Sequence, residues 1–309
     1  MTDAAAPPLI EAPDVQATKP GAAKRLLRNP SVLIGGLLIL LVAAIGLLAP
    51  LLTPIDPAAI NPSNRNKLPG FETTERDDDG NKVTRVARMG TDSLGRDIYA
   101  RVVYGARVSL TVGIAVAVLS VAVGLGVGLV AGYFRALDGV IMRVMDGLMA
   151  IPGILVAIAL VSLSGASLLT VVVAVTIPEI PRVVRLVRAI VLSIREEPYV
   201  EAAISVGTPT PKILWRHVLP NTIAPLIVQA TFIAGSAILL EAALSFLGVG
   251  IPPETPTWGN IMAEGRTAFQ LYPHNILYPA AFLTVTVLAV NMLGDGLRDT
   301  LDPRMAKRV

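Results

Sequence analysis

The sequence predicts an all-α membrane protein with six transmembrane helices. Of its 309 residues, 53% are hydrophobic and only 16% are charged, and the charges stand in blocks between long apolar runs, which is not a soluble composition. A helix needs about 20 apolar residues to cross a bilayer, and six runs approach or exceed that length. They are Ser31–Leu52, about Val108–Gly132, Val140–Leu163, Ser167–Val187, Thr222–Val249 and Ile276–Leu293.

The first run follows a tail, residues 1–30, that is rich in Ala and Pro and then basic. We predict a disordered cytosolic tail drawn to anionic lipid headgroups. Without interleaved aromatic residues, a nucleic-acid-binding arm is disfavoured. The run at 31–52 starts too late and is too long for a cleaved signal peptide, so it is predicted to be a retained first transmembrane helix. The basic residues of the tail are Lys19, Lys24, Arg25 and Arg28.

A long polar segment, residues 53–106, is predicted to be an extracytoplasmic loop. Much of 62–87 is expected to be irregular, with possible short strands. At its end Asp97 is expected to cap a short amphipathic helix, Ile98–Tyr104, with Tyr99 and Tyr104 at headgroup depth. We assign this stretch a structural role as an elbow and no chemistry.

Prolines and glycines mark positions of special geometry in the spans. Neighbouring helices can satisfy the carbonyl groups that prolines leave free. In the second span, Gly124, Gly128 and Gly132 form a repeated small-xxx-small pattern, which favours close helix contact. The prolines within or at the edges of spans are Pro152, Pro178, Pro181 and Pro225.

The most informative polar stretch is residues 195–221, REEPYVEAAISVGTPTPKILWRHVLPN. Pro198 suits a first helical position, and Gly207 can close that helix with a positive φ. A second short helix is expected to start with Thr210 as its cap and end before Pro220, with Asn221 capping the next apolar helix. The result would be a helix–turn–helix joined at both ends to membrane spans.

This stretch resembles the EAA loop of ABC-transporter permease subunits. The pattern is Glu-Ala-Ala, three residues, Gly, nine residues, a hydrophobic position, one residue and Leu-Pro. His217 replaces the usual apolar residue, as in the dipeptide and oligopeptide branch. The alternative is an ordinary cytosolic connector, but the spacing and the flanking spans favour the coupling loop. The matching residues are Glu201, Ala202, Ala203, Gly207, His217, Leu219 and Pro220.

Four further segments resemble the same branch in the same order, so that the likeness covers roughly residues 90–304. Trp258 in the third is expected to anchor at the membrane interface. In the last, Gly294 and Gly296 are expected to let the final helix end, and Asp302-Pro303 to turn the chain away. The segments begin with GTDSLGRD (residue 90), EAALSFLG (241), PPETPTWG (252) and NMLGDGLRD (291).

The resemblance implies the type I ABC importer (MetI-like) permease fold in a bacterial cytoplasmic (inner or cell) membrane. It implies a core permease domain at 107–297 and a cytosolic tail at 298–309. The implied partners are a second homologous permease subunit, two ATPase domains or subunits, an extracytoplasmic substrate-binding protein and membrane lipids. Dipeptides or oligopeptides are the implied cargo, although relatives also move nickel or other small solutes. ATP and magnesium would be used by the ATPase, so this chain is expected to hold no cofactor and to be no enzyme.

Three acidic residues stand within apolar runs. Glu241 is a candidate for the translocation pathway, because an ionisable residue in a span usually faces the bundle interior or a cavity. Interhelical hydrogen bonding is the equally weighted alternative. Asp146 and Glu179 are expected to be solvated at the membrane interface.

Orientation follows from Lys and Arg in the connections. If the amino end is inside, the tail, residues 133–143, 182–221 and 298–309 lie inside and are basic. The short outer connections hold only Arg266. Both termini and the EAA-like loop are therefore predicted to be cytosolic.

The sequence lacks the residues and motifs that several kinds of catalytic chemistry require. The sequence has no cysteine, two histidines and no phosphate-binding G-x-x-x-x-G-K-[ST] motif. A secondary transporter or channel that acts alone is the rival class, and it would predict paired inverted repeats, which we do not find. An intramembrane enzyme is a more distant alternative, since no nucleophile–base pair is evident.

Overall fold

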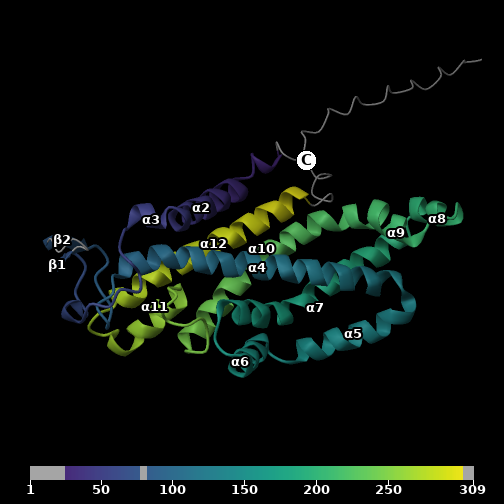
Figure 1. The fold of residues 1–309 in the computed structure, drawn as a ribbon. Coiled ribbons are helices and arrows are strands. Elements are labelled where there is room, and N and C mark those ends of the chain that lie inside the picture. Colours follow the sequence, from purple (N-terminus) through teal and green to yellow (C-terminus); the bar gives the residue numbers. More distant parts are fainter. Residues whose placement is uncertain (1–24, 77–81, 302–309) are drawn as a thin grey trace, which may run out of the picture.

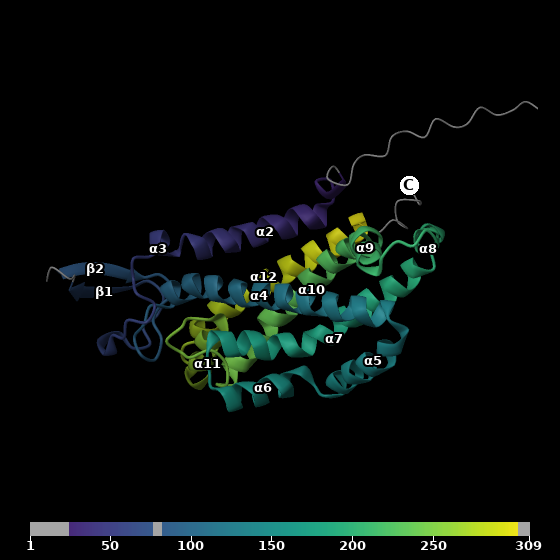
Figure 2. The same cartoon turned by 45° about the vertical axis from the view of Figure 1, so that its right-hand side comes forward.

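The computed structural model describes residues 25–76 and 82–301, which form an elongated bundle of helices (Figure 1). In both views β1, β2, α3 and α11 lie at one end, here called the α11 end, and α8 and α9 lie at the other, the α8 end (Figure 2). The long helices are α2 (Pro30–Leu47), α4 (Ile98–Tyr133), α5 (Arg135–Ala150), α6 (Gly153–Ser164), α7 (Leu168–Arg195), α10 (Leu219–Phe246) and α12 (His274–Leu301). The short elements are α3 (Ala49–Leu52), α8 (Pro198–Ser205), α9 (Thr210–Ile213), α11 (Trp258–Gly265), the 3-10 turns η1 (Pro62–Asn64) and η3 (Arg266–Ala268), the π-helical turn η2 (Leu214–Val218), and strands β1 (Phe71–Arg76) and β2 (Lys82–Ala87).

Among the described residues, four helices are long and apolar enough to cross a membrane, and a bent pair makes five if it counts as one span. The four are α2, α4, the helix that continues from α9 into α10, and α12; the pair is α5 and α6. The helix α7 is long enough, but it carries one glutamate and four arginines. Its place in the membrane therefore depends on how those charges are satisfied.

The expected single span at 140–163 is instead two helices that meet at an angle of 86°. The break falls at Ile151-Pro152, where Pro152 has no N–H to continue the α5 ladder. A side chain at Gly153 would approach Pro178 of α7 to 3.1 Å. The bend therefore lies directly against a proline of the neighbouring helix.

The glycine pattern of the second span has the predicted role. A Cβ atom at Gly124, Gly128 or Gly132 would lie 2.4–2.7 Å from the Cβ of a valine on α7. Real Cβ atoms do not approach so closely, so only glycine permits this packing. The valines recur at every fourth residue and fill the glycine positions in order: Val183, Val187 and Val191.

The polar segment before α4 contains short strands, as its sequence allows, since β1 and β2 pair as an antiparallel hairpin. Asp97 caps a helix as predicted, its Oδ1 accepting from the Ala100 N–H at 2.7 Å. However, residues 98–104 are no separate helix. They are the first turns of α4, so the expected boundary near residue 107 lies inside that helix.

The start of α2 packs against the last turns of α12. Asn29 caps α2 and donates from Nδ2 to the carbonyl of Gly296 and to the Thr300 hydroxyl, both at 3.3 Å. Gly294 and Gly296 do not end α12, which runs on to Leu301. Instead they allow close contact, because a Cβ at Gly296 would lie 2.7 Å from Val32. The predicted turn at 302–303, Lys19 and Lys24 lie outside the described residues.

Candidate coupling surface and central cavity

The EAA-like loop forms the α8 end. Pro198 opens α8 as predicted, and Gly207 follows it with φ +80°, a conformation that favours glycine. The Gly207 N–H donates to the Ile204 carbonyl and the Thr208 N–H to that of Ala203, which closes the helix. Because no atom of the other described residues, its chain neighbours aside, lies within 4 Å of the position that a Cβ at Gly207 would take, its requirement is conformational and not steric.

One face of this loop is anchored in the bundle. Val200, Ile213 and Val218 are fully or almost fully buried and belong to the main hydrophobic core. Arg195, the last residue of α7, donates from Nη1 to the carbonyls of Gly132 and Tyr133 at 3.4 Å, which fastens this end of α7 to α4. The loop is thus held in a fixed position relative to the long helices.

The opposite face exposes large apolar side chains. Val206 is 86% exposed and Trp215 is 74% exposed, and Tyr199 and Ile204 are also open to solvent. We call these four residues the coupling face. A group of this kind on a polar, helical end is typical of a surface that another protein covers.

The predicted coupling residues lie around this face. Glu201, Ala202, Gly207 and Pro220 are exposed, and the other three are partly buried. His217 packs against Tyr199, with ring centroids 5.9 Å apart, so it joins η2 to the start of α8. No hydrogen bond to the Glu201 carboxylate is present among the described residues. The partly buried three are Ala203, His217 and Leu219.

The second helix of the loop does not end before Pro220. The chain continues as one helix from Thr210 to Phe246, with a π-helical turn at 214–218 just before the proline. Such a turn accommodates a position that has no N–H to donate. Asn221 is no cap, since its Nδ2 donates back to the His217 carbonyl, and Thr210 is already the first residue of α9. The sequence could not show that the two helices are continuous.

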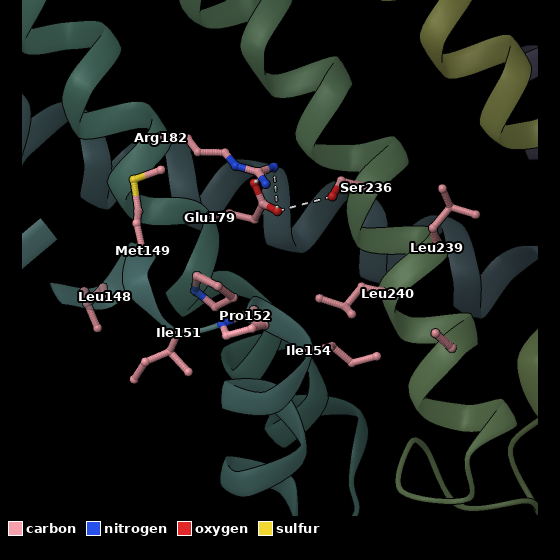
Figure 3. A pocket seen from close by; sticks show the side chains of 13 residues that line it. Leu148, Met149, Ile151, Pro152, Ile154, Glu179, Arg182, Ser236, Leu239 and Leu240 are labelled. Atoms are coloured by element: carbon pink, nitrogen blue, oxygen red, sulfur yellow. Dashed lines mark hydrogen bonds and ion pairs between the residues drawn. The ribbon is translucent and has the colours of Figure 1, made fainter. Parts of the chain in front are cut away.

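A cavity of about 500 Å³ lies at the bend between α5 and α6, against α7 and α10. Most of the residues that line it are apolar, including Pro152, Pro178 and Leu240. Its charged and hydroxyl groups are Glu179 and Arg182 of α7 and Ser236 of α10, which gather on one side of the cavity (Figure 3). A volume of this size suits a small-molecule ligand.

The expectation that Glu179 is solvated at the interface is wrong. It lies in the middle third of α7, and only 6% of its side chain is exposed. Arg182 Nη1 donates to both of its oxygens at 3.2 and 3.1 Å, and Ser236 Oγ donates to Oε1 at 3.2 Å. Asp146, by contrast, is largely exposed, as expected, and pairs with Arg185 at 2.6 Å.

Glu241 is fully buried in α10 and lines neither of the two cavities described here. Its Oε1 accepts from the Ser245 hydroxyl at 2.8 Å, and its Oε2 has no hydrogen-bond partner among the described residues. The hydrogen bond is within one helix, four residues apart. Whether Glu241 contacts cargo stays a prediction.

A second cavity, of about 740 Å³, lies near the α8 end between α7, α10 and α12. Pro220 and Asn221 line it together with Gln229 and Arg298. The helix α10 therefore contributes to both cavities, with Pro220 at its start and Ser236 farther along.

A buried network of charges joins α4 to α11 at the α11 end. Arg96 Nε contacts Asp92 Oδ2 at 2.7 Å, and Arg96 also pairs with Glu264. Arg101 is fully buried, 3.4 Å from both Glu264 and the Pro253 carbonyl. Burial raises the pKa of the Glu264 carboxyl above its ordinary value, and Arg101 and Arg96 oppose that rise. The ionised carboxylate therefore depends on these arginines.

The sequence places Trp258 at the membrane interface, but it is fully buried in the protein. Its Nε1 donates to the Val102 carbonyl at 3.1 Å, and its ring lies 6.3 Å from that of Phe282. It joins α11 to α4 and α12. Composition alone does not separate a tryptophan at a membrane interface from one under a loop.

The described residues contain no group of three or more His, Asp or Glu side chains that could hold a metal ion. The fold is that of a membrane protein with several helices able to span the bilayer and an anchored loop that exposes apolar side chains at one end. The family model for the inner membrane component of binding-protein-dependent transport systems matches residues 124–307. The family model for the N-terminal transmembrane domain of oligopeptide transport permease C matches residues 21–69. The chain therefore belongs to the family of binding-protein-dependent inner-membrane permeases, which are subunits of ABC transporters.

Several curated relatives match over most of their length. A probable peptide ABC transporter permease of Sinorhizobium fredii is 50% identical over 91% of both chains. A putative peptide transport system permease of Brucella abortus is 43% identical over 99% of both, and a dipeptide permease of Alkalihalophilus pseudofirmus is 42% identical over 92% of this chain and 89% of its own. A chain of the inward-facing MetNI methionine ABC transporter has the same fold, with a TM-score of 0.54, 18% identity, and coverage of 66% of this chain and 97% of that one.

Proposed function

We propose that this chain carries dipeptides or oligopeptides across the bacterial cytoplasmic membrane, driven by ATP hydrolysis on separate subunits. The relatives named as peptide or dipeptide permeases support this cargo. The observation that carries the coupling role is the EAA-like loop itself, which is anchored on one face and apolar and exposed on the other. An ATPase subunit docks on the coupling face.

Six helical segments cross the membrane in this proposal. They are α2, α4, the bent pair α5–α6, α7, α10 and α12. The charges of α7 do not preclude a span, because three of its four arginines pair with acids and Arg195 donates to backbone carbonyls of α4. Arg188, for example, contacts both oxygens of Asp138 on α5 at 2.5 and 2.6 Å.

Both chain ends and the coupling face lie on the cytosolic side. The contact of Asn29 with Gly296 and Thr300 supports this, because it puts the start of α2 beside the end of α12. The second cavity is lined by Pro220 as well as by Arg298, so the end of α12 is also near the EAA-like loop. Basic residues gather in these segments, as the positive-inside rule requires.

Movement passes from the coupling face to the cavity through one continuous helix. Residues 210–246 run without interruption from the loop to the cavity wall at Ser236 and Leu240. When the ATPases close, a displacement of the loop tilts α10, which changes the cavity beside α7. Glu201 pairs with a basic group of the ATPase, and Ala202 and Ala203 allow that subunit to approach closely.

The working assembly contains a second permease of similar fold, two ATPase domains or subunits, an external substrate-binding protein and surrounding lipid. The exposed apolar side chains of α2, among them Leu33, Leu37 and Leu40, face lipid or the second permease. ATP and Mg²⁺ are bound by the ATPase and not by this chain. Glu241 contributes a buried polar group to the α11 side of the pathway.

The test is peptide uptake and ATPase stimulation by the reconstituted complex carrying Glu201→Arg or Gly207→Asp. We expect both activities to fall at least about tenfold, since one variant reverses a docking charge and the other strains a left-handed residue. The control is Glu254→Arg, the same charge reversal at an exposed position near the α11 end. If both loop variants retain full uptake and stimulation, the coupling role is wrong. Uptake by this chain alone would favour a secondary transporter.

A further inference from the structure

The cavity at the α5–α6 bend is lined mainly by apolar residues, and it holds one guanidinium group whose donors are only partly used. Arg182 donates from Nη1 to Glu179, while its Nε and Nη2 make no hydrogen bond to any described residue. Its side chain remains 55% exposed. A guanidinium holds five N–H donors in a rigid fork, so Arg182 can bind a second anionic partner.

The guanidinium is also held in place. Glu179 binds it with both oxygens, and Ser236 donates to Oε1 of that carboxylate, so that the three groups form a chain from α7 to α10 (Figure 3). Both α7 residues stand next to prolines, Pro178 and Pro181, which restrict the local backbone. A group oriented in this way loses little freedom when it binds a ligand.

On this basis we propose that Arg182 binds the C-terminal carboxylate of the peptide during its passage, with Glu179 and Ser236 as positioning residues. This inference rests on the proposed function, peptide transport. Two parallel N–H···O bonds from one guanidinium edge match the geometry of a carboxylate. The apolar wall formed by Pro152, Ile154 and Leu240 receives the side chains of the cargo.

The charge balance of the cavity favours a peptide over a simple anion. Glu179 and Arg182 neutralise each other, so a lone anion would leave an uncompensated negative charge in a partly buried site. A peptide with both free ends is zwitterionic and adds no net charge. A peptide whose carboxylate is replaced by an amide loses the partner of Arg182.

The experiment compares a dipeptide with its C-terminal amide in the reconstituted complex with its binding protein. Each peptide is supplied with the binding protein saturated, and the readout is peptide transported per ATP hydrolysed. For the unmodified complex we expect the free acid to be transported about tenfold better than the amide, the change that loss of a charged hydrogen bond brings. Arg182→Gln should lower transport of the acid at least to that of the amide and should not lower transport of the amide.

The matched control is Arg185→Gln, which lies one turn along α7, pairs with exposed Asp146 and does not line the cavity. It should leave the ratio of acid to amide unchanged. Ser236→Ala should reduce that ratio by a smaller factor, and Arg182→Lys should restore it in part, because it keeps the charge without the fork. These two variants supply the test if Arg182→Gln does not fold.

The proposal is overturned if Arg182→Gln lowers acid and amide transport equally, or lowers neither. It is likewise overturned if the unmodified complex transports both peptides at the same rate. In each of these outcomes the unmodified complex still takes up peptides, so the proposed function stays intact. If the complex takes up no peptide at all, the proposed function itself fails, and this inference fails with it.

Discussion

The two ends of the bundle are closed in different ways. At the α11 end, Arg101 and Trp258 are fully buried and tie α4 to α11 and its flanking loop through ion pairs and a hydrogen bond. At the α8 end, the long helices meet through glycine–valine contacts, and the coupling face stays open. Buried charged and polar groups that contact one another fix the α11 end. Close packing, together with the Arg195 hydrogen bonds, fixes the α8 end and leaves a surface free.

The difference indicates which end changes its surroundings during function. Buried ion pairs are costly to separate, so the α11 end should remain assembled throughout a transport cycle. Among the described residues no ion pair covers the coupling face, and Val206 and Trp215 remain available to a partner. The two ends should therefore respond differently to substitution.

The largest effect is expected at the α11 end, for Arg101→Gln. The substitution leaves buried Asp92 and partly buried Glu264 with one cation fewer, and breaking a buried pair costs about 3–5 kcal/mol. The free energy of unfolding, measured by SDS titration in mixed micelles, should fall by that amount. Arg185→Gln, which removes an exposed pair, should cost less than about 1 kcal/mol. Equal losses of unfolding free energy in the two variants would contradict the claim that the buried ion pair stabilises the protein more than the exposed one.

The close packing of α4 on α7 gives the next largest effect. In Gly128→Ala the new Cβ would lie 2.7 Å from Val187, so α7 must shift, at a cost of about 1–3 kcal/mol. Gly126→Ala is the matched control, because no atom of the described residues outside its own stretch of helix lies within 4 Å of its Cβ position. The same SDS titration should show no loss for that variant. A loss confined to Gly126→Ala would contradict the packing described here.

The smallest effect is expected for Trp258→Phe. The ring volume is largely kept, but the Val102 carbonyl loses its donor, which costs about 1 kcal/mol. Trp215→Phe should leave the unfolding free energy unchanged, since Trp215 is exposed. Equal losses would mean that Trp215 is already covered within the isolated chain.

Much of the architecture follows from residue patterns. The apolar runs predict the long helices, the spacing of Gly124, Gly128 and Gly132 predicts the close contact with another helix, and Gly207 adopts the expected positive φ. These features depend on local periodicity or on one residue's conformational range. Both can be inferred from a single sequence.

Features that depend on tertiary partners are not predictable in this way. The burial of Glu179 requires Ser236 from a helix more than 50 residues away, and the burial of Trp258 requires α4 and α12. Pro220 lies in a continuous helix because a π-helical turn precedes it, and no residue pattern predicts that turn. The apolar run around Pro152 is unbroken, so it predicts one straight span and conceals the bend.

The most direct test of the central claim is to place a single cysteine on the coupling face. The sequence has no cysteine, so Val206→Cys supplies a unique thiol at an 86% exposed position. In the assembled complex we predict that it cross-links to the ATPase subunit and is not labelled from outside intact cells by an impermeant maleimide. Glu254→Cys, near the α11 end, should show the reverse. Labelling of Val206→Cys from outside, with no cross-link to the ATPase, would contradict the account.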